Sequence, residues 1–522
     1  MTGPIIGLCP DYVLYGADAM ERLSSATLNT VPDHIVRPVY ARQDMSVRIV
    51  HLGAGAFHRS HQAVYTDDIM QAGDELWGIL SVSLRNPAIT HALGPQDNLY
   101  TLLVRNHHQI DARIIGSIAR TAYLLDERDT VLNALTSPQT QIVTLTITQR
   151  GYYHDAESDS LDLNHPDIQL DLNSPHNAGT AIGVLAWAIF RRKQLGMQPL
   201  TLLSCDNMAA NGKVLQRVLE HYIERVQRDL GDRELLRHFL AQYACPCSLV
   251  DRDTPAIRAA DLAQAEALLG VHDAAPVITE PFSQWVIQDW FSAGRPPWEQ
   301  AGAVFAAHVQ PYEQMHERLL GGAQCALAYL GTTAGYKTAH EAMQAPDLAQ
   351  FIDDLMVEAA GTLPRLAKPG WQDYKARLML RFANPAVERS IAQLAMDATL
   401  VLPGSILEPM RIRLSHGLPI DRHALVVAAW IRCLTGLNER LEELFINDPM
   451  RNELLEAIRK AGGRTAGPHD LVDAVLGIKA VFGDSLPQDM EFVRCITAAL
   501  QSLLEDRSAG ALAALAAADH TQ

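Results

Sequence analysis

The chain has 522 residues and a formal net charge of −17, and 48% of its residues are hydrophobic and 20% charged. This length allows two or three domains with hydrophobic cores of their own, and the composition is that of an ordinary globular protein. The acidic balance argues against partners such as nucleic acid or an anionic membrane surface, although it leaves room for a local basic pocket that binds an anionic small molecule.

The cysteines and the absence of apolar runs indicate the compartment. The 7 cysteines are scattered, and only Cys245 and Cys247 lie close together. An odd, dispersed set is typical of a reducing cytosol, and no His or Cys cluster near this pair completes a zinc site, so we expect no metal. No charged start followed by an apolar segment and no run of ~18 apolar residues is present. We therefore expect a soluble, cytoplasmic protein without a membrane partner.

A stretch near the N-terminus carries the first functional motif. Residues 47–52 are apolar and β-branched and predict a short buried strand, which Gly53 and Gly55 interrupt. From His58 the chain has no Gly or Pro until Gly73, which predicts a helix. Strand, Gly-x-Gly and helix form the opening of a dinucleotide-binding fold, because glycines let the backbone approach a pyrophosphate and a helix N-terminus offers unpaired N–H groups.

This motif is incomplete on its own. A full fingerprint has a third glycine at position 58, and this chain has His58 there. The two glycines alone are equally compatible with an ordinary tight turn between a strand and a helix. His58, Arg59 and His61 crowd the turn with hydrogen-bond donors, and this crowding favours an anion-binding site.

The pattern after the motif indicates an α/β domain. Residues 1–45 show no strong periodicity and are predicted to be a lead-in of short elements packed on the first domain. Short apolar runs then alternate with helical stretches, the runs at 79–84, 101–104, 141–147 and 200–204 and the helices at 178–195 and 211–226. This alternation predicts a mostly parallel sheet covered by helices. Residues 162–176, rich in Asp, Asn and Pro, are predicted to be a loop.

The second half of the chain has a different character. After about residue 280 the pattern is helical, with predicted helices at 314–329, 348–361, 374–381, 424–434, 448–461 and 487–504. We place a boundary near 280–295. The predicted organisation is a lead-in at 1–45, a dinucleotide-binding Rossmann-type α/β domain at 46–285, a mostly α-helical C-terminal substrate domain at 286–506, and an Ala-rich tail at 507–522 that frays.

Several segments between residues 45 and 440 resemble those of one family. They are Gly53-Ala-Gly-Ala-Phe-His-Arg-Ser-His61, Gln96-Asp-Asn-Leu-Tyr-Thr101, Thr146-Ile-Thr-Gln-Arg-Gly-Tyr152, Ser204-Cys-Asp-Asn-Met-Ala-Ala-Asn-Gly212, Val250-Asp-Arg-Asp-Thr-Pro255 and Glu280-Pro-Phe-Ser-Gln-Trp-Val-Ile287. They resemble the mannitol dehydrogenase family of long-chain polyol dehydrogenases. The resemblance implies a Rossmann-type domain, a helical C-terminal domain and an active site between them. It also implies metal-free hydride transfer between a nicotinamide and a secondary alcohol or ketone of a small sugar-like substrate, by a monomer or homodimer.

The catalytic segment departs from the family pattern. The family reads Lys-x-x-x-x-Asn-x-x-His on one helix, where the Lys is the general base and the Asn and His hold the reacting oxygen. Aligned through the flanking segments, this chain has His316, Gly321 and Gln324 at those places. The family's Ser-Gln-Lys substrate clamp becomes Thr399-Leu400-Val401, which lacks the cation. The resemblance therefore implies a less polar and wider site.

The substituted residues can still support hydride chemistry. A general base needs a pKa near the working pH, and the ordinary pKa of an imidazole is ~6.5, so His316 could take the role of the Lys. Asp251 could orient it, and Asn211 occupies a further substrate position of the family. Gln324 can donate to a carbonyl oxygen, whereas Gly321 cannot, and the loss of one such donor typically costs ~10²–10³ in rate.

The resemblance also assigns the nucleotide contacts. The residues so assigned are Gly53, Gly55, Phe57, Arg59, His61, Gln96, Asp206 and Asn207. The strand at 79–84 is followed by Arg85 and not by the acidic residue that binds the ribose hydroxyls of NAD. Arg85 could contact the 2′-phosphate of NADP or stack on the adenine of NAD. We expect NAD because the family mostly uses it, with NADP as the alternative.

Three functions remain open from the sequence. The first is an NAD(P)-dependent oxidoreductase acting on a CH–OH group of an altered substrate with His316 as base. The second is a redox-neutral epimerase or lyase that uses the nicotinamide transiently. The third is a catalytically inactive protein that binds the dinucleotide or a partner. A lone histidine between Met315 and Glu317 on a helix is usually a surface or satisfied residue, and only its place at the lysine position singles it out.

Overall fold

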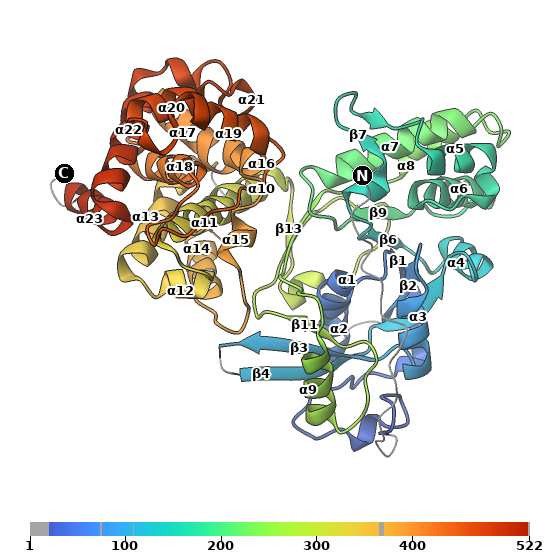
Figure 1. Ribbon diagram of the computed structural model, residues 1–522. Coiled ribbons are helices and arrows are strands. Elements are labelled where there is room, and N and C mark those ends of the chain that lie inside the picture. The colour runs from blue at the N-terminus through green and yellow to red at the C-terminus, as the bar shows by residue number, and fades with distance from the viewer. Residues whose placement is uncertain (1–19, 74–75, 108, 365–369, 520–522) are drawn as a thin grey trace. The chain divides into compact units, whose positions relative to one another are not determined.

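The computed structural model describes residues 20–519, with gaps at 74–75, 108 and 365–369. The chain divides into two compact units (Figure 1). The N-terminal unit comprises Met1–Val104 and Ile110–Phe305, and the C-terminal unit comprises Arg105–Gln109 and Ala306–Gln522. The first unit is built on a parallel sheet and the second is almost wholly helical, so the predicted α/β and α-helical classes are confirmed.

A parallel sheet of five strands is the centre of the N-terminal unit. Its order is β5-β2-β1-β6-β9, and each neighbouring pair is parallel. The strands are β1 (Ser46–Leu52), β2 (Trp77–Ser83), β5 (Ile118–Tyr123), β6 (Ile142–Leu145) and β9 (Thr201–Ser204). They are short and rich in Val, Ile and Leu because both faces of the sheet are covered. β1 lies between β2 and β6, which makes the junction of β1 with β6 the switch point of the sheet.

Helices flank this sheet (Figure 1). Alternate residues of its strands pack against helices on opposite faces. Val50 and Leu52 point to the face covered by α4 (Arg128–Leu135), α6 (Ala181–Gln194), α7 (Asn211–Val226) and α8 (Leu235–Gln242). Ile49 points to the other face, where α1 (Ala56–Ser60), α2 (Gln62–Gln71) and Trp285 cover it. This period of two is the one expected of a buried strand.

Smaller sheets complete the unit. One has the order β10-β12-β13, with β10 (Ser248–Asp251) antiparallel to β12 (Gln284–Gln288), and β13 is Val304–Ala306. Another has the order β11-β3-β4, with β11 (Val277–Thr279) parallel to β3 (Tyr100–Asn106), and β4 is Gln109–Ile115. The short strands β7 (His154–Asp155) and β8 (Ser160–Leu161) form an antiparallel ribbon.

Two buried helices form the core of the C-terminal unit. They are α11 (Gly322–Ala334) and α18 (Asp421–Leu434), whose inward faces are almost entirely inaccessible to solvent. Around them lie α10 (Gln310–Met315), α12 (Ala339–Met343), α13 (Pro346–Ala360), α14 (Trp371–Phe382), α15 (Ile391–Leu394), α16 (Ala398–Leu402), α17 (Glu408–Ser415), α19 (Arg451–Lys460), α20 (Pro468–Leu476), α21 (Lys479–Phe482), α22 (Met490–Glu505) and α23 (Arg507–Asp519). Two π-helical segments, η7 (His316–Gly321) and η8 (Pro403–Leu407), interrupt this α-helical pattern.

Three local predictions need correction or completion. The predicted loop at 162–176 contains helix α5 (Pro166–Asn173), which begins with a proline and is capped by His165 Nδ1 accepting from the Asp167 N–H. The tail predicted to fray forms α23, with Ala511 and Leu512 buried. Of the predicted lead-in, residues 1–19 lie outside the described residues, and the rest has the short helices η1 (Leu28–Thr30) and η2 (Arg42–Asp44).

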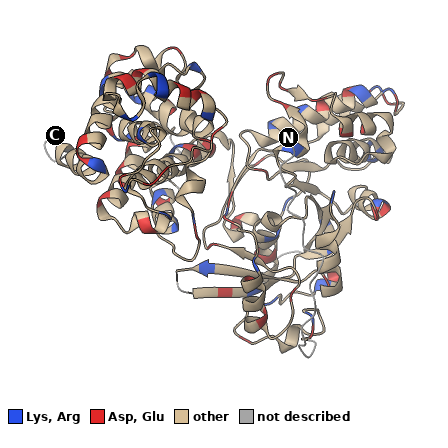
Figure 2. Ribbon diagram, viewed as in Figure 1, with Lys and Arg blue, Asp and Glu red and all other residues tan. Residues whose placement is uncertain are grey.

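The described residues contain neither a helix that could cross a bilayer nor a cluster of metal-ligating side chains. No helix there is long and apolar enough to cross a bilayer, and no three His, Cys, Asp or Glu side chains gather as metal ligands. Lys and Arg are interspersed with Asp and Glu in both units (Figure 2).

Candidate functional site

A pocket of about 810 Å³ opens at the carboxyl ends of β1, β2 and β6. Its walls are Gly53, Ala54 and Gly55 after β1, residues 83–86 at the end of β2, Thr146, Ile147 and Thr148 after β6, and Tyr153, Asp167 and Thr180 from the elements behind them. Open parallel sheets bind ligands at this edge, beside the switch point. The pocket therefore stands where a dinucleotide would lie.

The two glycines of the pocket have different tasks. Gly53 has a φ of +109°, and a Cβ there would lie 2.1 Å from the carbonyl oxygen of Thr146, so only glycine fits. A Cβ on Gly55 would meet no protein atom closer than 3.7 Å and would instead take up pocket space. The first glycine is thus required by the fold, and the second keeps the pocket wall open to a close ligand.

A polar cluster forms the outer rim of the pocket. Arg85 Nη2 donates to the Tyr153 hydroxyl at 2.7 Å and to Asp167 Oδ2 at 3.0 Å, and the Tyr153 hydroxyl donates to Asp167 Oδ2 at 2.8 Å. Burial together with the bond to Asp167 raises the pKa of Tyr153 to about 12. No acidic residue follows β2 directly, but the carboxylate of Asp167 on α5 lies against Arg85.

The donors that crowd the glycine turn in the sequence point into the protein. Arg59 Nη1 donates to the Ala275 carbonyl at 2.5 Å, and the guanidinium lies over the Tyr100 ring at 5.6 Å from its centroid. His61 contacts the Gln284 carbonyl oxygen through Nε2 at 2.9 Å and stacks on Phe57. Burial lowers the pKa of His61 to about 3. These side chains tie the turn to the segment before β11 and to β12, and they do not line the pocket.

Other predicted nucleotide residues support the pocket from behind. Asp206 accepts from the backbone N–H groups of Ile147 at 3.0 Å and Thr148 at 2.8 Å and from the Tyr152 hydroxyl at 2.7 Å, which shapes the pocket floor after β6. Asn207 follows it and is exposed.

Two predicted amide side chains connect backbone segments. Gln96 donates to Asp273 at 2.9 Å and accepts from the Ala274 N–H at 2.6 Å. Asn211, predicted to contact substrate, donates through Nδ2 to the carbonyls of Asp206 at 2.9 Å and Ser248 at 2.8 Å. Both protons of the Asn211 amide are therefore engaged within the N-terminal unit, where it joins α7 to β10.

The pocket contains residues that sequence reasoning missed. Ser83, Thr146, Thr148, Asp167 and Thr180 all line it. The Thr146–Thr148 segment was visible only as part of a family-like motif. Asp167 could not have been found, because it lies on a helix that was predicted to be a loop, and no local pattern places that helix against β2.

In the C-terminal unit, the predicted catalytic residues share one accessible stripe. Between residues 315 and 331 only His316, Glu317, Gly321 and Gln324 are not buried. The π-helical turn of η7 places these positions on one face of the helix, and such turns are frequent at functional sites. We call these four residues the accessible stripe.

The His316 ring is oriented from within its own unit. Its Nδ1 lies 3.1 Å from the hydroxyl of Tyr374, a side chain of α14 that is only 1% exposed. The neighbouring Arg318 points elsewhere and donates to the Thr362 carbonyl at 2.7 Å. Asp251, predicted to orient His316, ends β10 in the N-terminal unit. One group that contacts the His316 imidazole within its own unit is thus the Tyr374 hydroxyl.

The segment Thr399-Leu400-Val401, which the resemblance aligns with the family's substrate clamp, exposes apolar side chains. Leu400 is 69% exposed and Val401 is 37% exposed, whereas Thr399 is buried and bonded to Asp448 through its N–H at 2.9 Å and its hydroxyl at 2.7 Å. The two exposed positions of this segment carry apolar side chains and no cation.

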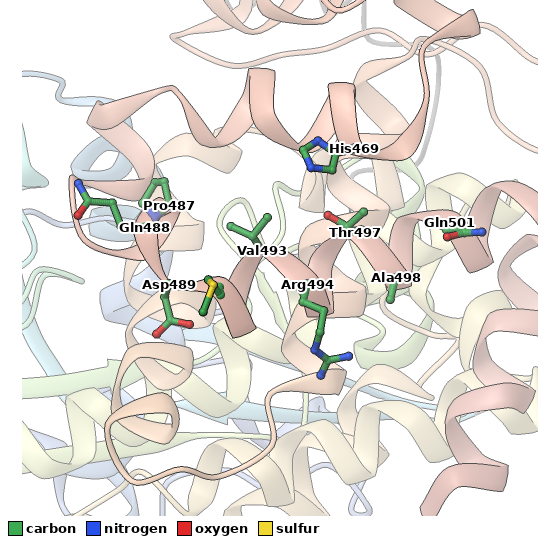
Figure 3. A pocket seen from close by; sticks show the side chains of 10 residues that line it. His469, Pro487, Gln488, Asp489, Val493, Arg494, Thr497, Ala498 and Gln501 are labelled. Carbon is green, nitrogen blue, oxygen red and sulfur yellow. The ribbon is translucent and has the colours of Figure 1, made fainter.

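Two further hollows in the C-terminal unit are lined by none of the residues predicted to be catalytic. A cavity of about 660 Å³ is lined by Tyr329, Trp430 and Glu442, among others, and Lys337 pairs with Glu442 at 2.8 Å. A surface hollow of about 500 Å³ lies between α20 and α22, and His469 and Thr497 border it (Figure 3). His469 is paired there with Asp473 at 3.0 Å.

A parallel sheet with a glycine turn at its switch point and a pocket above it defines a Rossmann-type dinucleotide-binding protein. The chain belongs to the mannitol dehydrogenase family. Residues 47–300 match the model of the mannitol dehydrogenase Rossmann domain, and residues 308–504 match that of the mannitol dehydrogenase C-terminal domain. The predicted family is thereby confirmed, and the chain is an oxidoreductase with a dinucleotide domain that fits NAD.

Relatives match over nearly the whole length. An uncharacterized oxidoreductase of Escherichia coli strain K12 (YdfI) is 39% identical over 90% of this chain and 95% of its own. The D-mannonate oxidoreductase of the same strain is 36% identical over 92% of this chain and 98% of its own. A solved ternary complex of Pseudomonas fluorescens mannitol 2-dehydrogenase with NAD and D-mannitol is 32% identical, covers 95% of this chain and 99% of its own, and has a TM-score of 0.73.

Proposed function

We propose that this protein is an NAD-dependent oxidoreductase that interconverts a secondary alcohol and a ketone of an open-chain sugar derivative, with His316 as the general base. The domain predicted at 46–285 would bind the nucleotide, and the domain predicted at 286–506 would bind the substrate. Family membership and the names of the relatives support the reaction class. The substrate and the roles of individual residues are our own assignments.

The observation that carries the proposal is the orientation of the His316 ring. The imidazole stands on the accessible stripe, and its Nδ1 is 3.1 Å from the buried Tyr374 hydroxyl. A second group that fixes the ring is what a positioned general base needs. A surface histidine of no function would not require a buried tyrosine to orient it.

Two residues of the accessible stripe, His316 and Gln324, have different roles in the proposed reaction. The bound nicotinamide would accept the hydride that leaves the alcohol carbon. His316 takes the hydroxyl proton in the same direction of reaction, and the carbon–oxygen single bond becomes a carbonyl. Gln324, four-fifths of a helical turn beyond Gly321, donates from its amide to that oxygen.

The nature of the substrate follows from what the segment at 399–401 lacks. Leu400 and Val401 present apolar surface and no cation. A substrate with a carboxylate bound at these two residues would lose charge compensation, which disfavours an anionic group there. We therefore propose that the end of the substrate that meets this segment is uncharged.

The rim of the nucleotide pocket supports NAD over NADP. The guanidinium of Arg85 is already paired with Asp167 at 3.0 Å, so it is neutralised before a 2′-phosphate could use it. Asp167 also offers a carboxylate acceptor for ribose hydroxyls, and its charge repels a phosphate. In this proposal Asp167 has the role that the residue after β2 has in many NAD-binding domains.

The test follows nicotinamide absorbance with hexitols, pentitols and aldonates, and in reverse with fructose, fructuronate and related ketoses. We expect turnover with NAD and an oxidation rate that rises with pH through one titration, since a neutral imidazole is the active form. His316→Ala should lower kcat by ~10²–10⁴, the usual contribution of a general base. His469→Ala, which removes a surface histidine of the same unit, should not change kcat.

Each outcome decides one part of the proposal. Turnover that survives in His316→Ala would overturn the assignment of the base but not of the reaction. Conversion of substrate without net NADH would show a redox-neutral enzyme. Tight NAD binding with no conversion of any compound would show that the protein has kept the nucleotide and lost the chemistry.

A further inference from the structure

The two π-helical segments of the C-terminal unit face one another through a glycine. A Cβ built on Gly321 of η7 would lie 2.3 Å from Oγ and 3.1 Å from Cβ of Ser405, which belongs to η8. The side chain of Ser405 therefore occupies the volume into which any side chain at position 321 would extend.

A second contact of the same kind runs in the opposite direction. A Cβ on Gly404 of η8 would lie 1.7 Å from Oε1 of Glu317 on η7. Each of the two π-helical segments thus has a glycine, and a side chain of the other segment occupies the space beside that glycine. This reciprocal packing fixes η8 against η7 and holds Ser405 at Gly321, in the middle of the accessible stripe.

The Ser405 hydroxyl is available for a ligand. The residue is 3% exposed, yet its Oγ forms no hydrogen bond with any residue that the structure describes. This unpaired oxygen is not sealed from solvent. A buried hydroxyl normally finds a partner, so an unpaired one that solvent reaches at the centre of a stripe of polar groups points to a ligand.

We propose that Ser405 is a catalytic residue whose hydroxyl donates a hydrogen bond to the reacting oxygen of the substrate, from the place where a side chain at position 321 would stand. This inference rests on the proposed function. During oxidation the C–H bond breaks as a hydride to the nicotinamide, the O–H proton passes to His316, and a C=O bond forms. Ser405 is not consumed, and its donor stabilises the oxygen while charge develops on it.

Removal of the hydroxyl alone is the first test. Ser405→Ala keeps the Cβ that packs on Gly321 and loses only the donor. We expect kcat to fall by ~10²–10³, with the KM, the NAD dissociation constant and the unfolding temperature nearly unchanged. Ser415→Ala is the matched control, because it removes an exposed hydroxyl of α17 that bonds the Ile412 carbonyl at 2.7 Å and lies 3.4 Å from His416 Nδ1, within its own helix end. Wild-type kcat in Ser405→Ala would overturn the inference.

An exchange of the two positions is the second test. Gly321→Asn alone should inactivate the enzyme, because the new Cβ would collide with Ser405 Oγ. Ser405→Gly should lose the donor and with it ~10²–10³ in kcat. The double variant Gly321→Asn with Ser405→Gly frees the volume and supplies an amide donor, so its kcat should exceed that of Ser405→Gly at least tenfold. A double variant no faster than Ser405→Gly would overturn the claim that the two side chains serve one position.

The failure of this inference can be told from the failure of the proposed function. A wild-type protein that converts no substrate overturns both. A wild-type protein that turns over, together with a Ser405→Ala variant that turns over equally fast, overturns only the role of Ser405. A merely structural role would instead lower the unfolding temperature of Ser405→Ala without a selective loss of kcat.

Discussion

At Gly53 in the N-terminal unit and at Gly321 in the C-terminal unit, a neighbouring element occupies the space that a side chain would need. The neighbour of Gly53 is backbone, whereas the neighbour of Gly321 is a side chain. Gly53 has a φ of +109° and faces the backbone carbonyl of Thr146 at 2.1 Å from where its Cβ would be. Gly321 has an ordinary helical φ of −61° and faces only the side chain of Ser405. One glycine is required by the main chain and the other by a residue that can be replaced.

This difference bears on how freely each of the two positions can change. No substitution elsewhere can remove the Thr146 carbonyl, so the glycine turn of the nucleotide pocket can vary little without loss of the fold. A side chain contact can be exchanged by two compensating substitutions. The accessible stripe can therefore change its chemical groups while the helices that carry it stay in place.

The largest expected effect comes from adding a methyl group to the nucleotide turn. Gly53→Ala combines left-handed strain with a collision against a carbonyl, which together cost about 2–5 kcal/mol of stability. We expect NAD binding to fall at least 100-fold, measured by calorimetry. Gly73→Ala is the control, because Gly73 has a φ of +92° but no atom within 4 Å of a built Cβ. If both variants bind NAD equally, backbone contact is not what fixes the pocket.

A buried charge cluster tests whether every side chain contact of the C-terminal unit is replaceable. Glu358 accepts from His423 Nδ1 at 2.5 Å and from Arg422 Nη1 at 3.3 Å, and both Glu358 and His423 are almost wholly buried. Glu358→Gln leaves the Arg422 guanidinium without its carboxylate partner and weakens the bond to His423, which should cost about 2–3 kcal/mol in the free energy of unfolding. Exposed Glu453 of α19 provides the control variant Glu453→Gln. An equal, small cost for both would show that this cluster is as exchangeable as the stripe.

The pH dependence of this cluster has a definite sign. Burial alone would raise the pKa of Glu358, but the hydrogen bond and the charges of His423, Arg413 and Arg422 outweigh it and lower the pKa below its usual 4.5. A carboxylate with a depressed folded pKa stabilises the fold above its unfolded pKa and ceases to do so as the pH falls through the folded value. The stability difference between wild type and Glu358→Gln should therefore be constant above pH 4.5 and shrink below it, as followed by denaturant titration at each pH.

A smaller effect is expected at the rim of the nucleotide pocket. Asp167→Asn removes the charge that neutralises Arg85 and repels a 2′-phosphate, so the ratio of NADP to NAD affinity should rise about fivefold, the scale of one exposed charge pair. Asp162→Asn changes a carboxylate of the same segment that does not line the pocket and should leave the ratio unchanged. An unchanged ratio in Asp167→Asn would mean that Asp167 does not select the nucleotide.

The difference between backbone and side-chain contacts also decides which features of the two units could be predicted from the sequence. The strand, Gly-x-Gly and helix were visible because backbone constraints leave their residues in a fixed local order. Helix α7, Asn211–Val226, was predicted with its observed bounds because its apolar face has a regular period. Asp167, Tyr374 and Ser405 could not be found, since each reaches its site through the packing of elements distant in the sequence. Arg59 and His61 were expected at an anion site because a sequence gives the residues of a turn but not the direction of their side chains.

The smallest effect concerns the C-terminal tail, which an Ala-rich sequence led us to expect to fray. The structure instead joins α23 to the rest of its unit, with the Ser508 hydroxyl donating to Glu439 Oε1 at 2.7 Å and the Ser508 N–H to the same oxygen at 2.5 Å. Ser508→Ala removes the first bond and keeps the second, so it should cost about 0.5–1.5 kcal/mol, the net value of one hydrogen bond. Thermal unfolding measures this loss, with Ser502→Ala of α22 as the control. Rapid hydrogen exchange throughout 507–519 in the wild-type protein would contradict the docking of α23 and restore the frayed tail.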